Sequence, residues 1–401
     1  MRLLTLILLC SLLFSCSKLT VSEPLPDIEG ITPSSISSDL TRINIVADAD
    51  LFENMYLNFA QNIEISAQIE YFDEKGILLL DESAKIRIRG SGSALNDMKS
   101  IGIIFTKKID NLALQIINTE QVLPGDDLCT LQSIRLRNSG NDDGVTHIKD
   151  LALTEFAIAN SIDLELKYGT ATQVFINGKY YGLLNIRTEN DRIALSDLLQ
   201  VDSSSITMLK SDFKNGNMEY KEGNFQLAQR LNQAIDDEDV FELKRLIDIT
   251  NFIDYILFED YLQNTDWPHN NARMYSVNGS KFRFLLFDLD RAFIRPKMNR
   301  LPLMEYLDDD ISKMYQILRA NDENFIPTLE KRQKELYTLF SPTRFNEIVD
   351  QLAHNIDGEI KYLIKKYGAP HSTLQWKMNV DKMKRDFDRN DHYNRNKYDL
   401  N

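Results

Sequence analysis

The stretch NTDWPHNNARMY, residues 264–275, places Asp266 five residues before Asn271. The segment FRFLLFDLDRAF, residues 282–293, then supplies Asp288 at the end of an apolar run. A β-hairpin is predicted between the two segments, and a hairpin brings its outer ends together. The sequence therefore predicts that the two acids and the amide converge.

The same segments carry three further signals of local structure. Pro268 ends any helix that precedes it and helps to fix a loop at this point. The pair Asn278-Gly279 supplies the positive φ angles that a two-residue hairpin turn requires. Asp290 follows Asp288 by two residues, which predicts that both acids share one face of a continuing strand.

An acid, an amide and a second acid in this order suit phosphoryl transfer. Protein kinases use Asp-x-x-x-x-Asn, a hairpin and then a metal-binding Asp, and Asp266, Asn271 and Asp288 follow the same order. Mg²⁺ prefers oxygen ligands and keeps several waters, so one carboxylate, one amide and nucleotide phosphates suffice. Asp and Asn are also common in loops, where they cap helices and form Asx-turns. The spacing alone is therefore a weak signal, which the hairpin and the later acids strengthen.

The N-terminal half contains residues suited to phosphate binding. In RIRGSGSALNDMKSIGIIF, Gly90 and Gly92 lie between two predicted strands and Lys99 begins the second. A glycine-bearing turn lets backbone N–H groups approach phosphates, and a lysine neutralises them. Glu189, after the predicted hairpin NGKYYGLLNIRTE, is suited to orient Lys99 as an ion pair. The alternatives are a plain loop with an exposed lysine, and a surface acid or helix N-cap at Glu189.

The composition of the chain narrows the classes of function. The 401 residues are 43% hydrophobic and 26% charged, which is typical of a globular protein. The net charge is −14 at pH 7 and no long basic run occurs, so nucleic-acid binding is not expected. The five histidines show no metal-ligand spacing, and neither a nucleophile elbow nor a dinucleotide-binding motif occurs in the sequence.

The N-terminus indicates export and membrane attachment. MRLLTLILLCSLLFSC, residues 1–16, has one Arg and then an apolar run too short to span a membrane, which is typical of a signal peptide. Its last residues resemble a bacterial lipobox, which predicts a lipidated Cys16 and a soluble domain tethered to a cell-envelope membrane, facing the periplasm or the cell exterior. Residues 17–40, rich in Ser, Pro and acids, then form a flexible tether. A secretory signal with an incidental Cys is the alternative.

The hydrophobic period changes along the chain. Alternating apolar and polar residues predict a strand-rich N-terminal lobe over residues 41–204. Apolar residues at three-and-four spacing predict a mostly helical C-terminal lobe over residues 205–390, and the polar tail 391–401 is expected to fray. The sequence thus predicts an α+β protein with a cleft between two lobes.

Five motifs in order resemble the spore-coat CotH family of atypical protein kinases. The motifs are IRIRGSGS, IRLRNSGNDD, VFINGKYYGLLNIRTE, NTDWPHNNARMY and FRFLLFDLDRAF. The resemblance implies a divergent bilobal protein-kinase-like fold that transfers the γ-phosphate of ATP to Ser or Thr of a protein substrate. It also implies Mg²⁺ or Mn²⁺ as the metal cofactor.

The resemblance also implies roles for single residues. Asp266 would be the catalytic or metal-coupled aspartate. Three side chains would hold the metal: Asn271, Asp288 and Asp290. Six residues would contact the nucleotide or support that contact: Gly90, Gly92, Lys99, Tyr181, Glu189 and Phe282. Tyr181 and Phe282 are the candidates for flanking the adenine ring, although the family usually has Trp at the position of Phe282. A Phe at that position stacks with less area than a Trp and offers no N–H.

Two other functions fit the same residues. The first is an envelope-anchored binding or assembly lipoprotein that keeps the fold and lacks turnover. The second is a metal-dependent hydrolase that cleaves phosphoesters with Asp266, Asp288 and Asp290, with His269 as a possible base. The sequence identifies no acceptor protein for the kinase reading.

Overall fold

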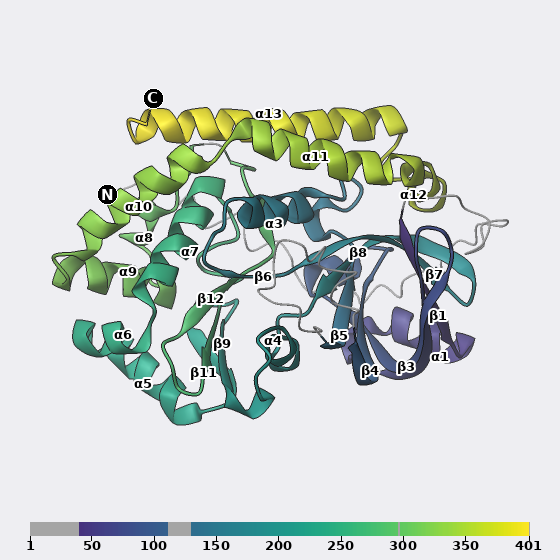
Figure 1. Cartoon of the computed structure of the whole chain (residues 1–401), viewed down its shortest axis with the longest axis horizontal. Helices are drawn as coiled ribbons and strands as arrows, with labels where there is room; N and C mark the ends of the chain where they lie inside the picture. Colours follow the sequence, from purple (N-terminus) through teal and green to yellow (C-terminus); the bar gives the residue numbers. More distant parts are fainter. Residues whose placement is uncertain (1–39, 111–129, 296, 401) are drawn as a thin grey trace, which may run out of the picture.

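A closed β-barrel forms the N-terminal half of the computed structural model, which describes residues 40–110, 130–295 and 297–400 (Figure 1). Seven strands close it in the order β1-β2-β3-β4-β5-β8-β7, and β1 pairs in parallel with β7. Apolar and polar residues alternate along β2, so the apolar side chains face the barrel interior and the polar ones face outward. The strands are β1 (Thr41–Ala47), β2 (Ile65–Phe72), β3 (Leu78–Arg89), β4 (Ser100–Asp110), β5 (Thr130–Arg137), β7 (Gly169–Ile176) and β8 (Lys179–Thr188).

A second sheet lies beside the barrel and carries the predicted hairpin. Its strand order is β10-β9-β11-β12-β6, with β11 and β12 antiparallel. The turn between them has φ 53° at Asn278 and 72° at Gly279, as the two-residue turn predicts. The strands are β6 (Glu165–Leu166), β9 (Ile206–Ser211), β10 (Met218–Glu222), β11 (Arg273–Val277) and β12 (Arg283–Leu286).

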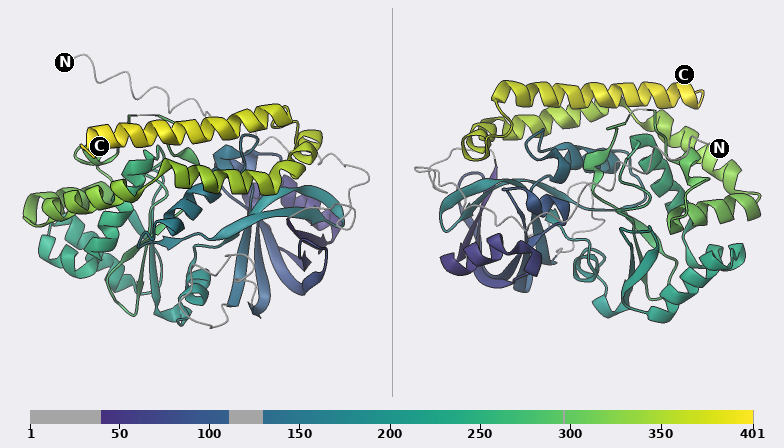
Figure 2. Two further views of the ribbon diagram at one scale, coloured as in Figure 1. Left: turned by 45° about the horizontal axis from the view of Figure 1, so that its top comes forward. Right: turned by 180° about the vertical axis from the view of Figure 1, so that it is seen from behind.

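Helices cover the second sheet and one end of the barrel. Both views of Figure 2 show α11 and α13 side by side, and α11 also packs on α3. The helices are α1 (Ala49–Leu57), α3 (Lys149–Ala159), α4 (Arg192–Leu198), α5 (Phe225–Asp236), α6 (Val240–Leu246), α7 (Ile249–Leu262), α8 (Leu301–Met304), α9 (Asp310–Asn321), α10 (Phe325–Leu339), α11 (Pro342–Ile356), α12 (Ile360–Tyr367) and α13 (Thr373–Lys397). Short 3₁₀ helices lie at η1 (Phe59–Gln61), η2 (Gly92–Leu95), η4 (Gly140–Asp142), η5 (Ser203–Ser205), η6 (Leu289–Arg291) and η7 (Asp357–Glu359).

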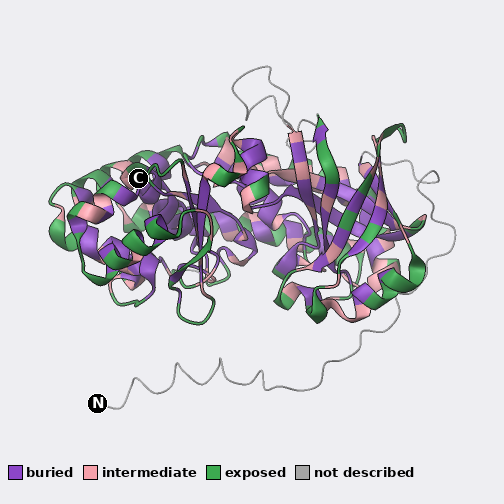
Figure 3. Cartoon of the chain, turned by 90° about the horizontal axis from the view of Figure 1, so that it is seen from below, coloured by how far each residue is buried: buried purple, intermediate pink, exposed green. Residues whose placement is uncertain are grey.

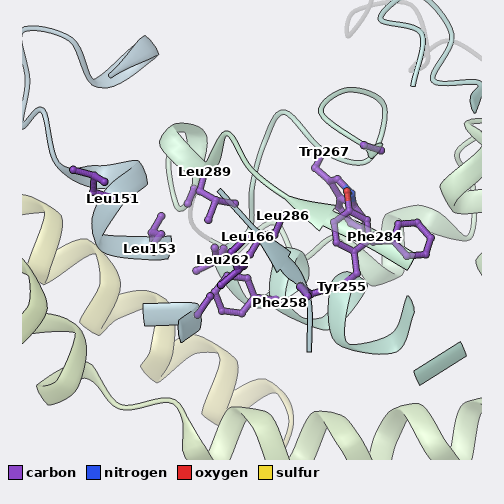
Figure 4. Close-up of a cluster of buried hydrophobic side chains, with 14 of the residues drawn as sticks. Leu151, Leu153, Leu166, Tyr255, Phe258, Leu262, Trp267, Phe284, Leu286 and Leu289 are labelled. Carbon is purple, nitrogen blue, oxygen red and sulfur yellow. The ribbon is translucent and has the colours of Figure 1, made fainter. Parts of the chain in front are cut away.

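The core of the helical half surrounds α7, whose residues from Asn251 to Leu262 are all buried. Figure 4 shows Tyr255, Phe258 and Leu262 of this helix among buried side chains from α3, β6 and β12. The ring of Phe156 on α3 packs on those of Phe258, Phe340, Phe345 and Phe387. Buried residues, purple in Figure 3, run through strands and helices alike. Helix α3 joins the barrel to the helical half, because its Thr154 also accepts a hydrogen bond from Arg187 of β8 at 3.0 Å.

The tail departs from the prediction of fraying from residue 391. Helix α13 continues to Lys397, because its last turns have buried polar partners. Asp391 accepts a hydrogen bond from the Tyr261 hydroxyl at 2.8 Å, and the Asn394 amide donates to the Tyr261 carbonyl at 2.9 Å. The Tyr398 hydroxyl donates to Asp260 at 3.1 Å. The polar composition of these residues suggested fraying, but their polar side chains form buried hydrogen bonds with α7.

The predicted export signal cannot be compared with the structure. Residues 1–16 with Cys16, and all of the predicted tether except residue 40, lie outside the described residues. Within the described ranges, no helix combines the length and the apolar character needed to cross a membrane.

Candidate active site

The loop after α7 is held in place by a buried tryptophan. Helix α7 ends at Leu262, and Gln263 caps it with a left-handed φ of 51°. The Trp267 side chain is 1% exposed, and its Nε1 donates to the Tyr255 hydroxyl at 2.9 Å. Figure 4 shows Trp267 directly above Tyr255 and Phe284. The neighbouring Asp266 is thereby fixed at the end of a rigid helix.

Asp266 and Asn271 form a hydrogen-bonded pair across this loop. The Asn271 side-chain amide donates to Oδ2 of Asp266 at 3.0 Å, and the Asn270 amide reaches the same oxygen at 3.3 Å. Asn271 has φ 58° and leads directly into β11. The predicted approach of Asp266 and Asn271 is therefore present.

Asp288 and Asp290 follow β12 and share one cation. Nη2 of Arg137, on β5, donates to both carboxylates, with 2.8 Å to Oδ2 of Asp290. The backbone and side-chain amides of Asn141 each donate to Asp290 at 3.0 Å. Gly140 has φ 62°, and a Cβ at this position would collide with Asp290, so the turn needs glycine. Burial, and then the charge of Asp288, raise the pKa of Asp290 to about 7.

Arg137 also contacts Asp150, the acid in the first turn of α3. Its Nε lies 3.6 Å from Oδ2 of Asp150, and Arg187 reaches the same oxygen at 3.1 Å. Burial opposes ionisation of Asp150, yet the charges of Arg187 and Arg137 lower its pKa. Asp150 also accepts a hydrogen bond from the backbone N–H of Leu289 at 2.9 Å. A buried network thus links barrel, helix α3 and the segment of Asp288.

Glu259, on α7, is a buried acid that feels the charges of both Asp266 and Asp288. It is fully buried, and neither carboxylate oxygen has a hydrogen-bond partner among the described residues. Burial raises its pKa to about 8; the Asn264 amide and the Arg300 charge offset part of this shift, whereas Asp266 and Asp288 add to it. Because the charges of both aspartates act on this one buried carboxyl, both lie within electrostatic range of it.

A cluster of cations surrounds Glu189 where β5 and β8 of the barrel face the second sheet. Arg135 contacts both oxygens of Glu189, at 3.0 and 2.8 Å, and Nε of Arg89 lies 3.6 Å from it. Burial opposes ionisation, yet the charges of Arg135, Lys167 and Arg89 hold the pKa of Glu189 well below its usual range. Burial and the neighbouring Arg135 lower the pKa of Lys167 strongly. Arg273 joins the cluster, since it acts on Glu189 and Arg135.

This cluster has unused hydrogen-bonding capacity. Nε of Arg89 and Nε of Arg273 are buried without a partner in the described part of the chain. Three arginines, Arg89, Arg135 and Arg273, face Glu189 and the nearby Asp191, so the region carries excess positive charge even while burial favours the neutral form of Lys167. Such a region fits a polyanion, because charge-assisted hydrogen bonds to phosphate are the strong ones.

The family model described as CotH kinase protein matches residues 86–393, which span the barrel from the end of β3 onward, the acid network and most of the helical half. The chain belongs to the CotH kinase family. No curated protein matches the chain.

The role that the CotH resemblance implied for Lys99 is not supported by its contacts. The Lys99 amino group donates to the carbonyls of Ala94 at 2.7 Å and Asn96 at 3.0 Å. It also lies 4.8 Å from the ring centroid of Tyr56 and 4.5 Å from that of Phe59. The ion pair predicted with Glu189 is absent among the described contacts, because Glu189 pairs with arginines instead.

The glycine turn forms as predicted but is tied to the barrel. Gly90 has φ 104° and Gly92 opens η2. The Asn138 amide donates to the carbonyls of Ser93 at 3.0 Å and Met98 at 2.6 Å, which fixes the turn against β5. Lys99 therefore closes the turn internally by bonding its own carbonyls.

The two rings that were expected to flank adenine lie in the core. Tyr181 is 1% exposed, and its hydroxyl exchanges hydrogen bonds of 2.8 Å with the backbone N–H and carbonyl of Lys99. Phe282 is completely buried, and its backbone N–H donates to Leu246 at 2.7 Å beneath α6. Both rings stabilise the fold, so neither is placed to stack on a base.

The predicted metal ligands fit Mg²⁺ better than a tightly caged metal. The described ranges hold no group of three or more His, Cys, Asp or Glu side chains placed to bind a metal ion. Asp266, Asn271 and Asp288 offer two carboxylates and an amide, and Mg²⁺ completes such a sparse set with water and phosphate oxygens. The carboxyl oxygens of the nearby Glu259 are buried without a hydrogen-bond partner in the described part of the chain, and a cation bound beside them would favour the ionised form.

Sequence reasoning missed Arg137, Asp150, Glu259 and the cluster around Glu189. One signal was available: Arg135 and Arg137 alternate with apolar residues in LQSIRLRN, so both point to the same face of one barrel strand. Two arginines on a single strand face need acids or a polyanion opposite them. Glu259 gave a weaker signal, as one of three acids in the mostly apolar helix NFIDYILFEDYLQ.

Proposed function

We propose that this CotH-family protein transfers the γ-phosphate of ATP to a Ser or Thr of a protein substrate in the presence of Mg²⁺ or Mn²⁺. The observation that carries the proposal is the hydrogen-bonded pair of Asp266 and Asn271 before the hairpin, together with an Asp288 after it that an arginine links to α3. Loop acid, loop amide, hairpin and second acid occur in the order that protein kinases use. On this proposal the barrel and the helical half correspond to the two lobes of a divergent protein-kinase-like fold.

Each part of the site has a role in this reaction. Asp266 accepts the proton of the acceptor hydroxyl, whose oxygen bonds to the γ-phosphorus while the bond to the β–γ bridging oxygen breaks and ADP leaves. Asn271 and Asp288, with Asp290 behind them, would hold the metal. A bound Mg²⁺ supplies neutralisation of charge that develops on the transferring phosphate. The binding site for the phosphates is the excess cation region of Arg89, Arg135 and Lys167.

Arg137 is a positioning residue in this scheme. It fixes the Asp288 carboxylate through Nη2 and is itself fixed by Asp150 on α3. The carboxylates of Asp288 and Asp290 lie against one guanidinium, which offsets part of their mutual repulsion. The segment that carries the metal ligands is therefore pre-organised by the barrel, and little rearrangement is needed when nucleotide binds.

The experiment is a transfer assay on the full-length chain with γ-labelled ATP, Mg²⁺ or Mn²⁺, and a serine-rich protein acceptor. Asp288→Asn should abolish transfer while leaving the melting temperature close to that of the wild type. The matched control is Asp308→Asn, since the Asp308 side chain is 99% exposed. Nucleotide binding without transfer to any acceptor would contradict the proposal.

A second candidate is an assembly or binding lipoprotein that keeps the CotH fold and lacks turnover. The burial of Tyr181 and Phe282 favours it, because the adenine ring then loses both expected stacking partners. This candidate predicts Mg²⁺ binding with no phosphoryl transfer, and the same assay separates the two.

The proposal also includes a cellular location. We infer from the sequence alone that Cys16 carries lipid and that the domain faces the periplasm or the cell exterior, anchored to a membrane. A protein acceptor in the envelope would then be its partner. Mass spectrometry of the mature N-terminus tests this, and an unmodified Cys16 in the mature chain would contradict it.

A further inference from the structure

Helix α13 lies along the outside of the molecule. Figure 1 and both views of Figure 2 show it with one side against α11 and the other side turned away from the rest of the chain. The inner side is apolar and buried through Trp376, Val380, Met383 and Phe387. The opposite side is exposed, so its side chains form part of the protein surface.

Five exposed residues follow one another on this opposite side at spacings of three and four, which places them on one face of the helix. Leu374 is 69% exposed and Met378 is 60% exposed. The next three residues of the series are basic. We call the five residues the outer face of α13: Leu374, Met378, Lys382, Arg385 and Arg389. The face is therefore apolar near the start of the helix and cationic along the part that follows.

The charge of this part of the chain is opposite to that of the whole protein. Residues 360–397, which contain α12 and α13, carry ten Lys or Arg and four Asp, a net charge of +6. The complete chain has a net charge of −14. A basic surface on an acidic protein is attracted to an anionic partner, while the rest of the protein is repelled by it. The partner should therefore meet the chain at α12 and α13.

The acids of α13 have partners of their own, away from the middle of the outer face. Asp381 lies 3.7 Å from Nζ of Lys384, and Asp388 accepts a hydrogen bond from the Asn346 amide of α11 at 3.3 Å. Asp391 pairs with Arg395 at 2.8 Å. Asp386 bridges Lys382 and Arg389, whose side chains remain 64% and 70% exposed.

Other cations of this region are available to a partner. Arg385 is exposed and forms no ion pair with the residues that the structure describes. The same holds for Lys361 and Lys365, which lie one turn apart on α12. Helix α12 packs on α13, so these lysines extend the basic region beyond the start of the outer face.

An apolar end and a cationic stretch on one exposed helix face suit an anionic membrane surface. The apolar side chains enter the boundary between headgroups and acyl chains, and the cations meet the anionic headgroups. Lys and Arg also lay their alkyl stems on apolar material while the charge stays in water. The tether predicted at residues 17–40 would hold the domain within roughly 30 Å of such a surface, so that a weak contact suffices.

We propose that the outer face of α13 binds the surface of a membrane rich in anionic phospholipids. Leu374 and Met378 insert between headgroups, and Lys382, Arg385 and Arg389 contact the lipid phosphates. This contact is a second membrane attachment, separate from the lipid predicted on Cys16. It does not rest on phosphoryl transfer, because membrane binding is measured without nucleotide or acceptor.

The test is co-sedimentation of the full-length chain with vesicles of phosphatidylglycerol and, separately, of phosphatidylcholine. The chain carries Cys16→Ser, so that no acyl chain contributes, and residues 1–15 are the same in every variant. Binding to phosphatidylglycerol should be the tighter of the two and should weaken as salt is added. Combined Lys382→Gln, Arg385→Gln and Arg389→Gln should weaken it about tenfold or more. Combined Leu374→Ser and Met378→Ser should weaken it about fivefold or more.

The matched control removes the same charge from three exposed positions elsewhere. Lys75 lies in the β2–β3 turn, Lys281 lies in the β11–β12 turn, and the Arg245 side chain on α6 is 77% exposed. Combined Lys75→Gln, Arg245→Gln and Lys281→Gln should keep binding within about twofold of the parent chain, because these cations are farther from the lipid than the screening distance. Circular dichroism checks that every variant folds.

Three results would overturn the proposal. The first is equal binding to the two lipids, and the second is equal weakening by the outer-face and control substitutions, which would reduce the effect to net charge. The third is self-association without binding to phosphatidylglycerol that Leu374→Ser with Met378→Ser abolishes, because the outer face would then bind a second copy of this chain.

Discussion

The side-chain amide of Asn271 lies 3.0 Å from Oδ2 of Asp266 and donates a hydrogen bond to it across the loop that follows α7. The bond leaves the Asn271 carbonyl oxygen and the second Asp266 oxygen free for other partners. An acid held this way has a fixed orientation before any substrate binds, which is what a proton acceptor requires. The five-residue spacing of Asp266 and Asn271 therefore determines how the two side chains are oriented toward each other.

Asp266→Asn should reduce phosphoryl transfer by about 10²- to 10⁴-fold, because the general base is lost while the shape is kept. The measurement is the initial rate of label transfer from γ-labelled ATP. Asp308→Asn, at a fully solvated position, should keep the wild-type rate. A rate for Asp266→Asn within twofold of wild type would show that another group accepts the proton.

Arg137→Met should destabilise the protein by about 3–5 kcal/mol, since it leaves Asp150, Asp288 and Asp290 without their shared cation. Urea unfolding at neutral pH measures the change. The control is Arg344→Met, whose exposed pair with Glu347 contributes at most about 0.5 kcal/mol. Equal effects of the two substitutions would mean that the buried network is not stabilising.

Local chemistry explains which parts of the site could be predicted from sequence. The hairpin turn at Asn278-Gly279 and the Asp266–Asn271 pair each depend on residues within a few positions of one another, so spacing and turn type determine them. The α+β class follows from the change of hydrophobic period. These features need no knowledge of how distant strands align.

The features that sequence could not supply depend on distant pairings. Arg137 reaches Asp288 only because the register of β5 in the barrel directs its side chain toward the second sheet. The amino group of Lys99 turns inward because the rings of Tyr56 and Phe59, from the α1–η1 region, lie over it. Neither contact is encoded in residues near the motif, so the motifs predicted a phosphate-binding role for Lys99 and no role for Arg137.

Lys99 and Arg135 can be compared as candidate ligands for the phosphates of ATP. Lys99→Met should change the affinity for ATP by less than about twofold, because its amino group bonds backbone carbonyls. Arg135→Gln should weaken ATP binding about tenfold or more through loss of charge-assisted hydrogen bonds to phosphate. Calorimetric titration with ATP and Mg²⁺ measures both, after circular dichroism confirms that each variant folds. The reverse order of effects would restore the lysine as the phosphate ligand.

Asn394→Ala should cost about 1–3 kcal/mol, because it removes two buried hydrogen bonds, one to the Tyr261 carbonyl and one from the Asn299 amide. The loss should appear as a lower urea midpoint with an unchanged slope. Lys382→Ala, on the exposed face of the same helix, should stay within about 0.5 kcal/mol. A neutral result for Asn394→Ala would support the frayed tail expected from composition.

The buried carboxylate of Glu259 should impose a pH dependence on stability. Its pKa is raised from 4.5 to about 8 on folding, chiefly by burial. Between these two values the folded protein keeps a proton that the unfolded chain releases. The stabilising contribution is therefore complete below about pH 4.5 and is lost as the pH rises through about 8.

Glu259→Gln should remove this component, because an amide keeps the neutral shape at every pH. The free energy of unfolding in urea, measured at pH 5, 7 and 9, should fall more steeply with pH in the wild type than in the variant. Glu347→Gln, at an exposed site, should follow the wild-type curve. Parallel curves for wild type and Glu259→Gln would show that the carboxylate is ionised in the folded protein across this range, and that Arg300 compensates its charge fully.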